Sequence, residues 1–413
     1  MAAAFEEGEA IPNHYIVKLK EGTVFDNHVY KVSNLLAKRD NVASDLIDIV
    51  TVANYSMPGF VGYSGYLDEQ AVDALRNNEE VEYVQPDIFY TVNAAIAIPD
   101  DQTSGNIVPP SLDGSTSNPD SEYPGTYFKI DPNNGNWGLG AISNPASGDA
   151  DLSYYWHDQT LGEGVTIYVC DTGVDVTHPE FEGRASWGFS AYGTYTDGHG
   201  HGTHCAGISA SKTYGVAKKA SIVAVKVLAD NGYGSTSAIL QGYEWVYKNS
   251  DHTKSVINNS LGSPAHDSAL KQAQLALGRA GIIFAGAAGN DNADSCMGNP
   301  GESTAETIIV GNHDINYAKT RSSSWGTCVD IWAPGTNILS TIPGGKTARM
   351  TGTSMAAPHV AGVAALFLGQ GVQAKDVWNK MQALSIKNKI TGLNSYDHNR
   401  MLYNGAGWSV LDY

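Results

Sequence analysis

Four short segments of this 413-residue chain carry side chains that together could catalyse acyl transfer. A serine hydroxyl becomes a useful nucleophile when an imidazole accepts its proton and a carboxylate fixes the imidazole tautomer. The chain supplies these groups in the order Asp171, His201 and Ser354. Asn290 adds an amide that could donate to the oxyanion of a tetrahedral intermediate, where one such donor lowers the barrier by ~3–4 kcal/mol.

Small residues surround Ser354, in the stretch Gly-Thr-Ser-Met-Ala-Ala-Pro-His that opens an apolar helical segment. The N-terminus of a helix favours developing negative charge. Each residue also has an ordinary structural explanation: Asp171 as a turn or capping residue, Asn290 as a turn residue after a strand. A capping role for Ser354 would not explain the other groups, so their coincidence favours catalysis.

The histidine-rich segment permits a second interpretation. His199, His201, His204 and Cys205 are all metal-ligand types, which would suit a metal-dependent hydrolase. Only His201 and Cys205 stand four residues apart, and no glutamate lies between them as in the His-Glu-x-x-His motif. Catalysis by the serine is therefore the favoured hypothesis.

Apolar runs and helical stretches alternate from residue 137 to the C-terminus. The apolar runs are residues 165–170, 221–227 and 281–286, and helical spacing occupies residues 236–247 and 268–280. This alternation predicts an α/β fold with a mostly parallel sheet flanked by helices. Ligands bind at the carboxyl ends of such strands, which is where Asp171 and Asn290 fall.

The chain divides into three zones. Residues 11–92 show the order β-α-β-β-α-β, which predicts a small α+β domain of ferredoxin-like type. Residues 93–136 are crowded with Pro, Gly, Ser, Asn and Asp and predict a flexible connector that holds a processing site. Residues 137–413 form the predicted α/β domain.

Composition excludes some partners. The 25 basic and 43 acidic residues give a net charge of −18, which argues against nucleic acid. No apolar run approaches the ~20 residues of a membrane span. The N-terminus shows neither a basic start nor an apolar core, so no signal peptide is visible, and one could have been removed.

In these segments the chain resembles the subtilisin-like serine proteases, and among them the proteinase K-like branch. The resemblance extends from residue 137 to about residue 371. It implies a seven-stranded-type sheet flanked by helices and hydrolysis of peptide bonds through an acyl-enzyme. Asp171 would orient His201, His201 would act as general base and acid, Ser354 would be the nucleophile, and Asn290 would donate to the oxyanion. A catalytically silent pseudoprotease that serves as a binding module is the alternative.

The resemblance also implies a substrate cleft. Its matching residues are Gly232, Ser260, Leu261, Gly262, Ala288 and Gly289. Residues 260–262 would pair with a substrate strand, and Gly232 would form the opposite rim. Ala288 and Gly289 would line a roomy, uncharged pocket for aromatic or large aliphatic side chains. Ser263 and Asn259 depart from the family pattern, which usually has a second glycine and an apolar residue there.

Residues 11–92 resemble the inhibitory propeptide of this family, with Val81-Glu-Tyr-Val-Gln-Pro-Asp as the matching signature. The resemblance implies a self-processing zymogen whose propeptide assists folding and acts as an intramolecular inhibitor. We expect the scissile bond between Tyr90 and Gly135. Expected partners are protein and peptide substrates, for an enzyme that acts as a monomer.

The resemblance further pairs Cys296 with Cys328, a loop of about 30 residues whose closure would stabilise by roughly 3–4 kcal/mol. Cys205 would be a free buried thiol and Cys170 a small buried apolar residue. A Cys170–Cys205 bridge is the less favoured alternative.

No cofactor is expected for the chemistry, but calcium is expected as a structural ion. Asp330 would supply a carboxylate, and Ala305 and Thr307 their carbonyl oxygens. The propeptide and the disulfide imply an extracellular, secreted enzyme, with the vacuole as the alternative compartment.

Overall fold

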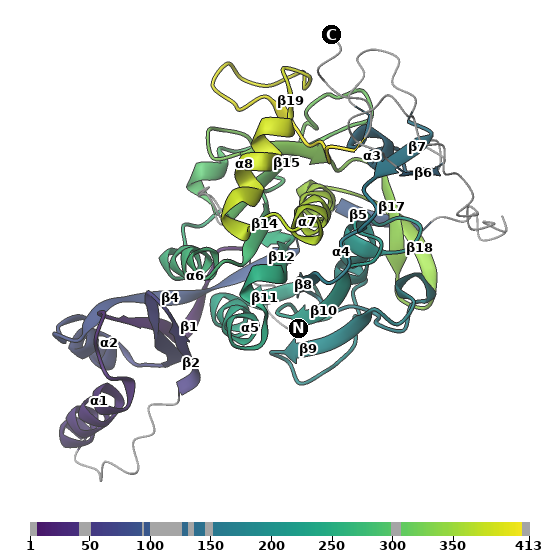
Figure 1. The fold of residues 1–413 in the computed structure, drawn as a ribbon. Coiled ribbons are helices and arrows are strands. Elements are labelled where there is room, and N and C mark those ends of the chain that lie inside the picture. Colours follow the sequence, from purple (N-terminus) through teal and green to yellow (C-terminus); the bar gives the residue numbers. More distant parts are fainter. Residues whose placement is uncertain are drawn as a thin grey trace.

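The computed structural model describes residues 6–40, 51–92, 95–99, 126–130, 136–144, 152–298 and 307–406. A small N-terminal domain packs against helices α5 and α6 of a larger α/β domain, and its last strand, β4, extends into that domain (Figure 1). The division agrees with the predicted small α+β domain followed by a larger α/β domain.

The larger domain is built on a nine-stranded sheet in the order β19-β20-β16-β15-β14-β12-β8-β10-β9. Seven consecutive strands pair in parallel, and β20 joins them in parallel at the β16 end: the seven are β8 (Thr166–Asp171), β9 (Ala185–Ser190), β10 (Ser221–Lys226), β12 (Ser255–Asn259), β14 (Ile283–Ala287), β15 (Thr307–His313) and β16 (Ile331–Pro334). The short strands β20 (Arg400–Met401) and β19 (Ile386–Lys387) extend one edge, and β19 is antiparallel to β20. The predicted seven-stranded-type parallel sheet is therefore confirmed, with a two-strand extension.

Helices cover both faces of this sheet. They are α3 (Trp137–Ala141), α4 (His201–Ala210), α5 (Thr236–Asn249), α6 (Ser268–Arg279), α7 (Thr353–Gly369) and α8 (Ala374–Leu384). In β8, Ile167 and Val169 join the apolar cluster that contains α4 and α7, whereas Tyr168 and Cys170 join the cluster that contains α5 and α6. Successive side chains of a strand point to opposite faces, so an apolar run such as β8 must be buried on both.

The N-terminal domain contains β1 (Ala10–Leu19), α1 (Phe25–Asp40), β2 (Thr51–Met57), β3 (Phe60–Tyr66), α2 (Glu69–Arg76) and β4 (Val81–Val92). Its strands form an antiparallel sheet in the order β4-β1-β3-β2, which confirms the predicted β-α-β-β-α-β order. Helix α2 begins where Asp68 accepts a hydrogen bond from the Ala71 N–H at 2.7 Å, and it buries Ala71, Val72 and Leu75.

The remaining strands are short. They are β5 (Ala95–Pro99), β6 (Thr126–Lys129), β7 (Tyr154–His157), β11 (Tyr233–Ser235), β13 (Leu261–Gly262), β17 (Ile338–Ile342) and β18 (Lys346–Thr351). Strand β5 pairs with β18, and β6 pairs with β7. Two segments of the predicted connector are thus strands paired with the larger domain.

Cys296 and Cys328 form a disulfide, with an S–S distance of 2.09 Å, which confirms the predicted pair. Cys170 and Cys205 are buried free thiols, so the alternative bridge is not formed. Within the described ranges no single helix has the length and apolar character needed to cross a membrane, and α7 and α8 meet that criterion only jointly, with a bend of 117° between them.

Candidate active site

A buried carboxylate–imidazole pair lies at the carboxyl edge of the parallel sheet. Asp171 is the last residue of β8 and His201 the first residue of α4, and both are completely buried. His201 Nδ1 lies 2.7 Å and 2.9 Å from the two Asp171 carboxylate oxygens. Burial alone would lower the pKa of His201, but the Asp171 carboxylate outweighs it and raises this pKa well above the usual value. The carboxylate therefore stabilises the imidazolium that forms when His201 accepts a proton.

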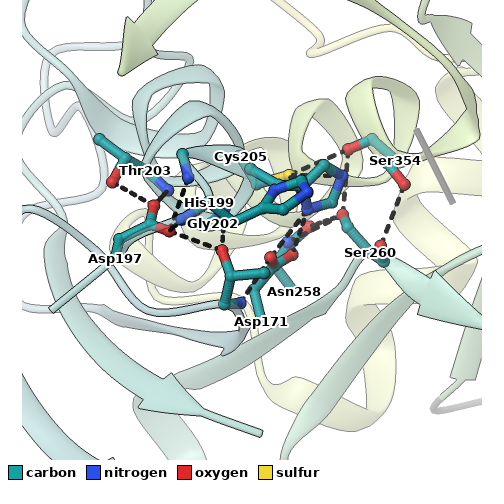
Figure 2. A network of polar contacts seen from close by, with 12 residues as sticks. Asp171, Asp197, His199, Gly202, Thr203, Cys205, Asn258, Ser260 and Ser354 are labelled. Carbon is teal, nitrogen blue, oxygen red and sulfur yellow. Dashed lines mark hydrogen bonds and ion pairs between the residues drawn. The ribbon is translucent and has the colours of Figure 1, made fainter. Parts of the chain in front are cut away.

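Ser354 lies beside this pair, in the first turn of α7 (Figure 2). Its Oγ donates to the Ser260 carbonyl at 3.0 Å, and Ser260 Oγ donates to the Ser354 carbonyl at 3.0 Å. Cys205 Sγ lies 3.4 Å from the Ser354 carbonyl oxygen and 4.0 Å from both ring nitrogens of His201. The fold thus gathers Asp171, His201 and Ser354 into one cluster although they are distant in the sequence.

Asn290 is held next to the residue that precedes Ser354. Its Oδ1 accepts from the Thr353 N–H at 3.0 Å and from Thr353 Oγ1 at 3.3 Å. The oxygen of the amide is thereby committed to α7, so its Nδ2 is the atom that could donate to a bound substrate. Gly289, the preceding residue, has φ +105°, and a Cβ there would meet Ser324 Oγ at 3.0 Å.

The expected cleft contains the last residues of β4. Thr91 pairs with Tyr233 on one side and with Gly262 on the other, and Val92 pairs with Leu261. The Val92 N–H donates to the Gly232 carbonyl at 3.1 Å. Residues 232 and 260–262 therefore form the two rims of a slot that takes up an extended strand by main-chain hydrogen bonds.

Strand β5, which follows the cleft strand β4 in the sequence, is also anchored near Ser354. Strand β5 resumes at Ala95, which is paired with Thr351 at the end of β18. Thr351 stands three residues before Ser354, so the chain is anchored close to Ser354 both before residue 93 and after residue 94.

Ala288 and Gly289 line a hollow next to Ser263, as the resemblance implied. The expectation that this pocket is uncharged was wrong, because Asp291 and Asp294 are among the residues that line it. Asp294 accepts from the Cys296 N–H at 3.0 Å and caps a short 3-10 helix (Ser295–Met297). Ala288 and Gly289 have small side chains as expected, but the loop after β14 brings carboxylates to the pocket.

Sequence reasoning missed Asp197. This buried carboxylate accepts from Thr172 Oγ1 at 2.8 Å and from the Gly200 N–H at 2.7 Å. It also accepts from the Thr203 N–H at 2.9 Å and from Thr203 Oγ1 at 2.6 Å (Figure 2). The Thr172 hydroxyl in turn accepts from the Gly202 N–H at 3.0 Å. Asp197 thus joins the residue after Asp171 to the first turn of the helix that carries His201. An acid four residues before His201 was the available signal.

We expect Asp197→Asn to lower kcat by about 10²-fold with little change in KM, since one oxygen becomes a donor that faces other donors and Asp171 and His201 lose their alignment. Steady-state kinetics well below the melting temperature measure the effect. Asp230→Asn is the control, because Asp230 bonds the neighbouring Gly198 N–H but is half exposed. An Asp197→Asn variant with normal kcat and only a lower melting temperature would reduce Asp197 to a structural role.

The four ligand-type residues of the alternative metal interpretation are not gathered around one point. His204 Nε2 lies 3.1 Å and 3.0 Å from the carbonyl oxygens of Ile338 and Ala348, and burial lowers its pKa to about 3. Asp171, His201 and Cys205 do have ligand atoms within 4.8 Å of one another. The hydrogen bond between Asp171 and His201 accounts for this closeness.

The expected calcium ligands do not form a complete set within the described residues. Asp330 Oδ2 accepts from the Ile309 N–H at 2.8 Å, Thr307 opens β15, and Ala305 lies outside the described residues. Calcium takes six to eight oxygens, so Asp330 and the Thr307 carbonyl alone fall short of a site.

A buried carboxylate–imidazole pair beside a serine in the first turn of a helix is the arrangement of serine hydrolases. Residues 162–408 match the subtilase family (Peptidase S8), and residues 14–93 match peptidase inhibitor I9. The chain therefore belongs to the subtilase family and is a subtilisin-like serine endopeptidase preceded by an I9 propeptide.

Similar proteins agree with this assignment. The chain is 38% identical over 417 residues to Subtilisin-like protease 3 of Arthroderma otae and of Trichophyton tonsurans, covering 97% of this chain and 92% of each relative. It is also similar to a crystal structure of a cold adapted subtilisin-like serine proteinase, with a TM-score of 0.61 and 38% identity over 66% of this chain and 98% of that one.

Proposed function

We propose that this zymogen cuts its own propeptide and then other peptides by an Asp-His-Ser acyl-enzyme mechanism. The observation that carries the proposal is the propeptide strand β4, which lies between β11 and β13 and leads directly to the cluster of Asp171, His201 and Ser354. Main-chain pairing on both sides of Thr91 holds the end of this strand in an extended conformation, and such positioning is what makes attack by a nearby nucleophile effectively unimolecular.

In the proposed reaction, Ser354 Oγ attacks the carbonyl carbon while His201 Nε2 accepts the hydroxyl proton. Asp171 holds the Nδ1–H and stabilises the imidazolium. Asn290 Nδ2 and the Ser354 N–H donate to the oxyanion. His201 then protonates the leaving amine, and a water molecule, deprotonated by the same imidazole, hydrolyses the acyl-enzyme.

We propose Asn93–Ala94 as the processing bond. Val92 is paired with Leu261, next to the Ser260 that bonds Ser354. Ala95 is paired with Thr351, three residues before Ser354. The bond between residues 93 and 94 is the central one of the three that connect these anchored residues. It also lies within the window of residues 90–135 predicted from the sequence.

Labelling with a fluorophosphonate tests the mechanism, and N-terminal sequencing of the processed chain tests the bond. We expect one label, on Ser354, and a mature chain that begins at Ala94. Inhibition by a transition-metal chelator together with indifference to the fluorophosphonate would instead support the metal-dependent hydrolase. A folded chain with neither labelling nor cleavage would support the silent pseudoprotease.

We also propose a substrate preference and a cellular compartment for this enzyme. The small residues Ala288 and Gly289 support a broad preference before the scissile bond, which includes aromatic or large aliphatic residues and still admits Asn93 of the processing site. The Cys296–Cys328 disulfide supports an oxidising compartment, extracellular or, as the alternative, vacuolar. We propose a monomer that acts on proteins and peptides, without nucleic-acid or membrane partners.

Glu7, in the N-terminal segment, should make the affinity of the peptidase for its cleaved propeptide depend on pH. The Gly8 N–H donates to the Phe89 carbonyl at 2.9 Å, which lays this segment along β4. Burial raises the pKa of Glu7 from 4.5 to about 7; a hydrogen bond with Thr91 opposes this shift and the Asp291 carboxylate adds to it. Because the bound form holds the proton more tightly, the affinity is greatest below pH 4.5 and falls as the pH rises to 7.

We therefore expect the dissociation constant of the cut propeptide to rise by up to roughly 10²-fold between pH 4.5 and 7.5. Native mass spectrometry of the processed protein across this range measures the fraction still bound. Glu7→Gln removes the titrating group and should flatten that part of the profile. A wild-type profile that does not change with pH would contradict the prediction.

A further inference from the structure

The side chain of Tyr90 is buried in the peptidase domain, away from the reacting bond. Tyr90 lies in β4 opposite Gly234 of β11 and is completely buried. It belongs to the same apolar cluster as Ile239 and Tyr243 of α5 and Leu261 of β13. The strand in the cleft therefore delivers an aromatic ring into an apolar site.

This site ends on a carboxylate. The Tyr90 hydroxyl donates to Asp267 Oδ2 at 3.0 Å, and Thr236 Oγ1 donates to the same oxygen at 2.6 Å. Asp267 is only 1% exposed, and its Oδ1 caps α6 by accepting from two backbone N–H groups of the first turn. Burial and the nearby Asp267 raise the pKa of Tyr90 well above its usual value, so the phenol remains a hydrogen-bond donor.

Two donors to Asp267 leave with the propeptide. One is the Tyr90 hydroxyl, and the other is Gln85 Nε2, which donates to Asp267 Oδ1 at 2.8 Å. Thr236 and α6 belong to the peptidase and remain. When the phenyl ring of a substrate enters the site that Tyr90 has left, it excludes water from the Asp267 carboxylate but supplies no hydrogen-bond donor in place of Tyr90 and Gln85. A ring that carries a hydroxyl replaces one of them.

We propose that Asp267 makes this peptidase select tyrosine over phenylalanine at the fourth residue before the scissile bond. This inference rests on the proposed function and on cleavage at Asn93–Ala94, which places Tyr90 fourth. A site built to bond a hydroxyl discriminates against the analogue without it because the polar group is buried with one hydrogen bond fewer. The tyrosine hydroxyl donates to a charged acceptor, which makes this hydrogen bond a strong one, but Thr236 and the first turn of α6 continue to donate to Asp267. We therefore expect kcat/KM to be about 10- to 100-fold higher for tyrosine than for phenylalanine.

Two fluorogenic peptides that differ only in Tyr or Phe at the fourth position test the proposal on the matured enzyme. We expect wild type to favour the Tyr peptide about 10- to 100-fold in kcat/KM. In Asp267→Ser, serine keeps an N-cap for α6 but is too short to reach the phenol, so the ratio should fall to within about twofold of 1. Asp267→Asn, which keeps the length of the side chain and loses its charge, should give an intermediate ratio.

Equal cleavage of the two peptides by wild type would overturn this specificity and leave the protease mechanism standing. An unchanged ratio in Asp267→Ser, at an active-site count confirmed by fluorophosphonate titration, would also overturn it. Absence of both labelling and cleavage in wild type would overturn the proposed function, and this inference with it.

Discussion

Replacing Ser354 by alanine is expected to lower kcat for peptide substrates on the order of 10⁶-fold and to leave the chain unprocessed. Alanine keeps the helical conformation of α7 and removes only the hydroxyl. Without the hydroxyl no acyl-enzyme forms, and the Asp171–His201 pair has no proton to move. Purified Ser354→Ala protein should therefore migrate at the full length of 413 residues.

The matched control is Ser186→Ala, because Ser186 is exposed on β9 and far from the cleft. That variant should process and cleave as the wild type does. A Ser354→Ala chain that matured in isolation, free of any other protease, would show that this serine does not perform the processing. Comparison of melting temperatures before kinetics separates lost chemistry from lost folding.

Replacing Asp171 by asparagine should lower kcat by about 10⁴-fold with only a small effect on KM. Its two oxygens now lie 2.7 Å and 2.9 Å from His201 Nδ1 and hold the proton on that nitrogen. An asparagine amide can donate to Nδ1 instead, which stabilises the other tautomer and leaves Nε2 protonated. Nε2 could then no longer accept the proton of Ser354.

Steady-state kinetics and the rate of fluorophosphonate labelling measure this loss. Labelling should slow together with kcat, because both need the activated hydroxyl. Asp175→Asn is the control: Asp175 lies four residues further along, is partly exposed, and accepts from the Gly344 N–H at 2.9 Å. We expect that variant to stay within a few-fold of wild type. Equal losses in the two variants would point to disturbed folding of the loop after β8.

The sequence by itself determined the architecture and the candidate chemistry. Buried parallel strands need apolar side chains on both faces, so runs such as residues 165–170 are visible without coordinates. The alternation of such runs with helical spacing predicted the α/β sheet, and the motifs around Asp171, His201 and Ser354 predicted the family. The roles of these three residues are still predictions, but their meeting at one edge of the sheet follows from where the strands end.

Only the tertiary structure showed which side chains from different elements bond to one another around the cleft. Asp267 looks like an ordinary acid in the sequence, and the only signal for Asp197 is its position four residues before His201. Their roles come from hydrogen bonds between β8, α4, β4 and α6 that form once the chain has folded. The carboxylates in the hollow beside Ala288 and Gly289 were missed for the same reason: local periodicity reports which face of an element is buried, but not which loop of another element closes over it.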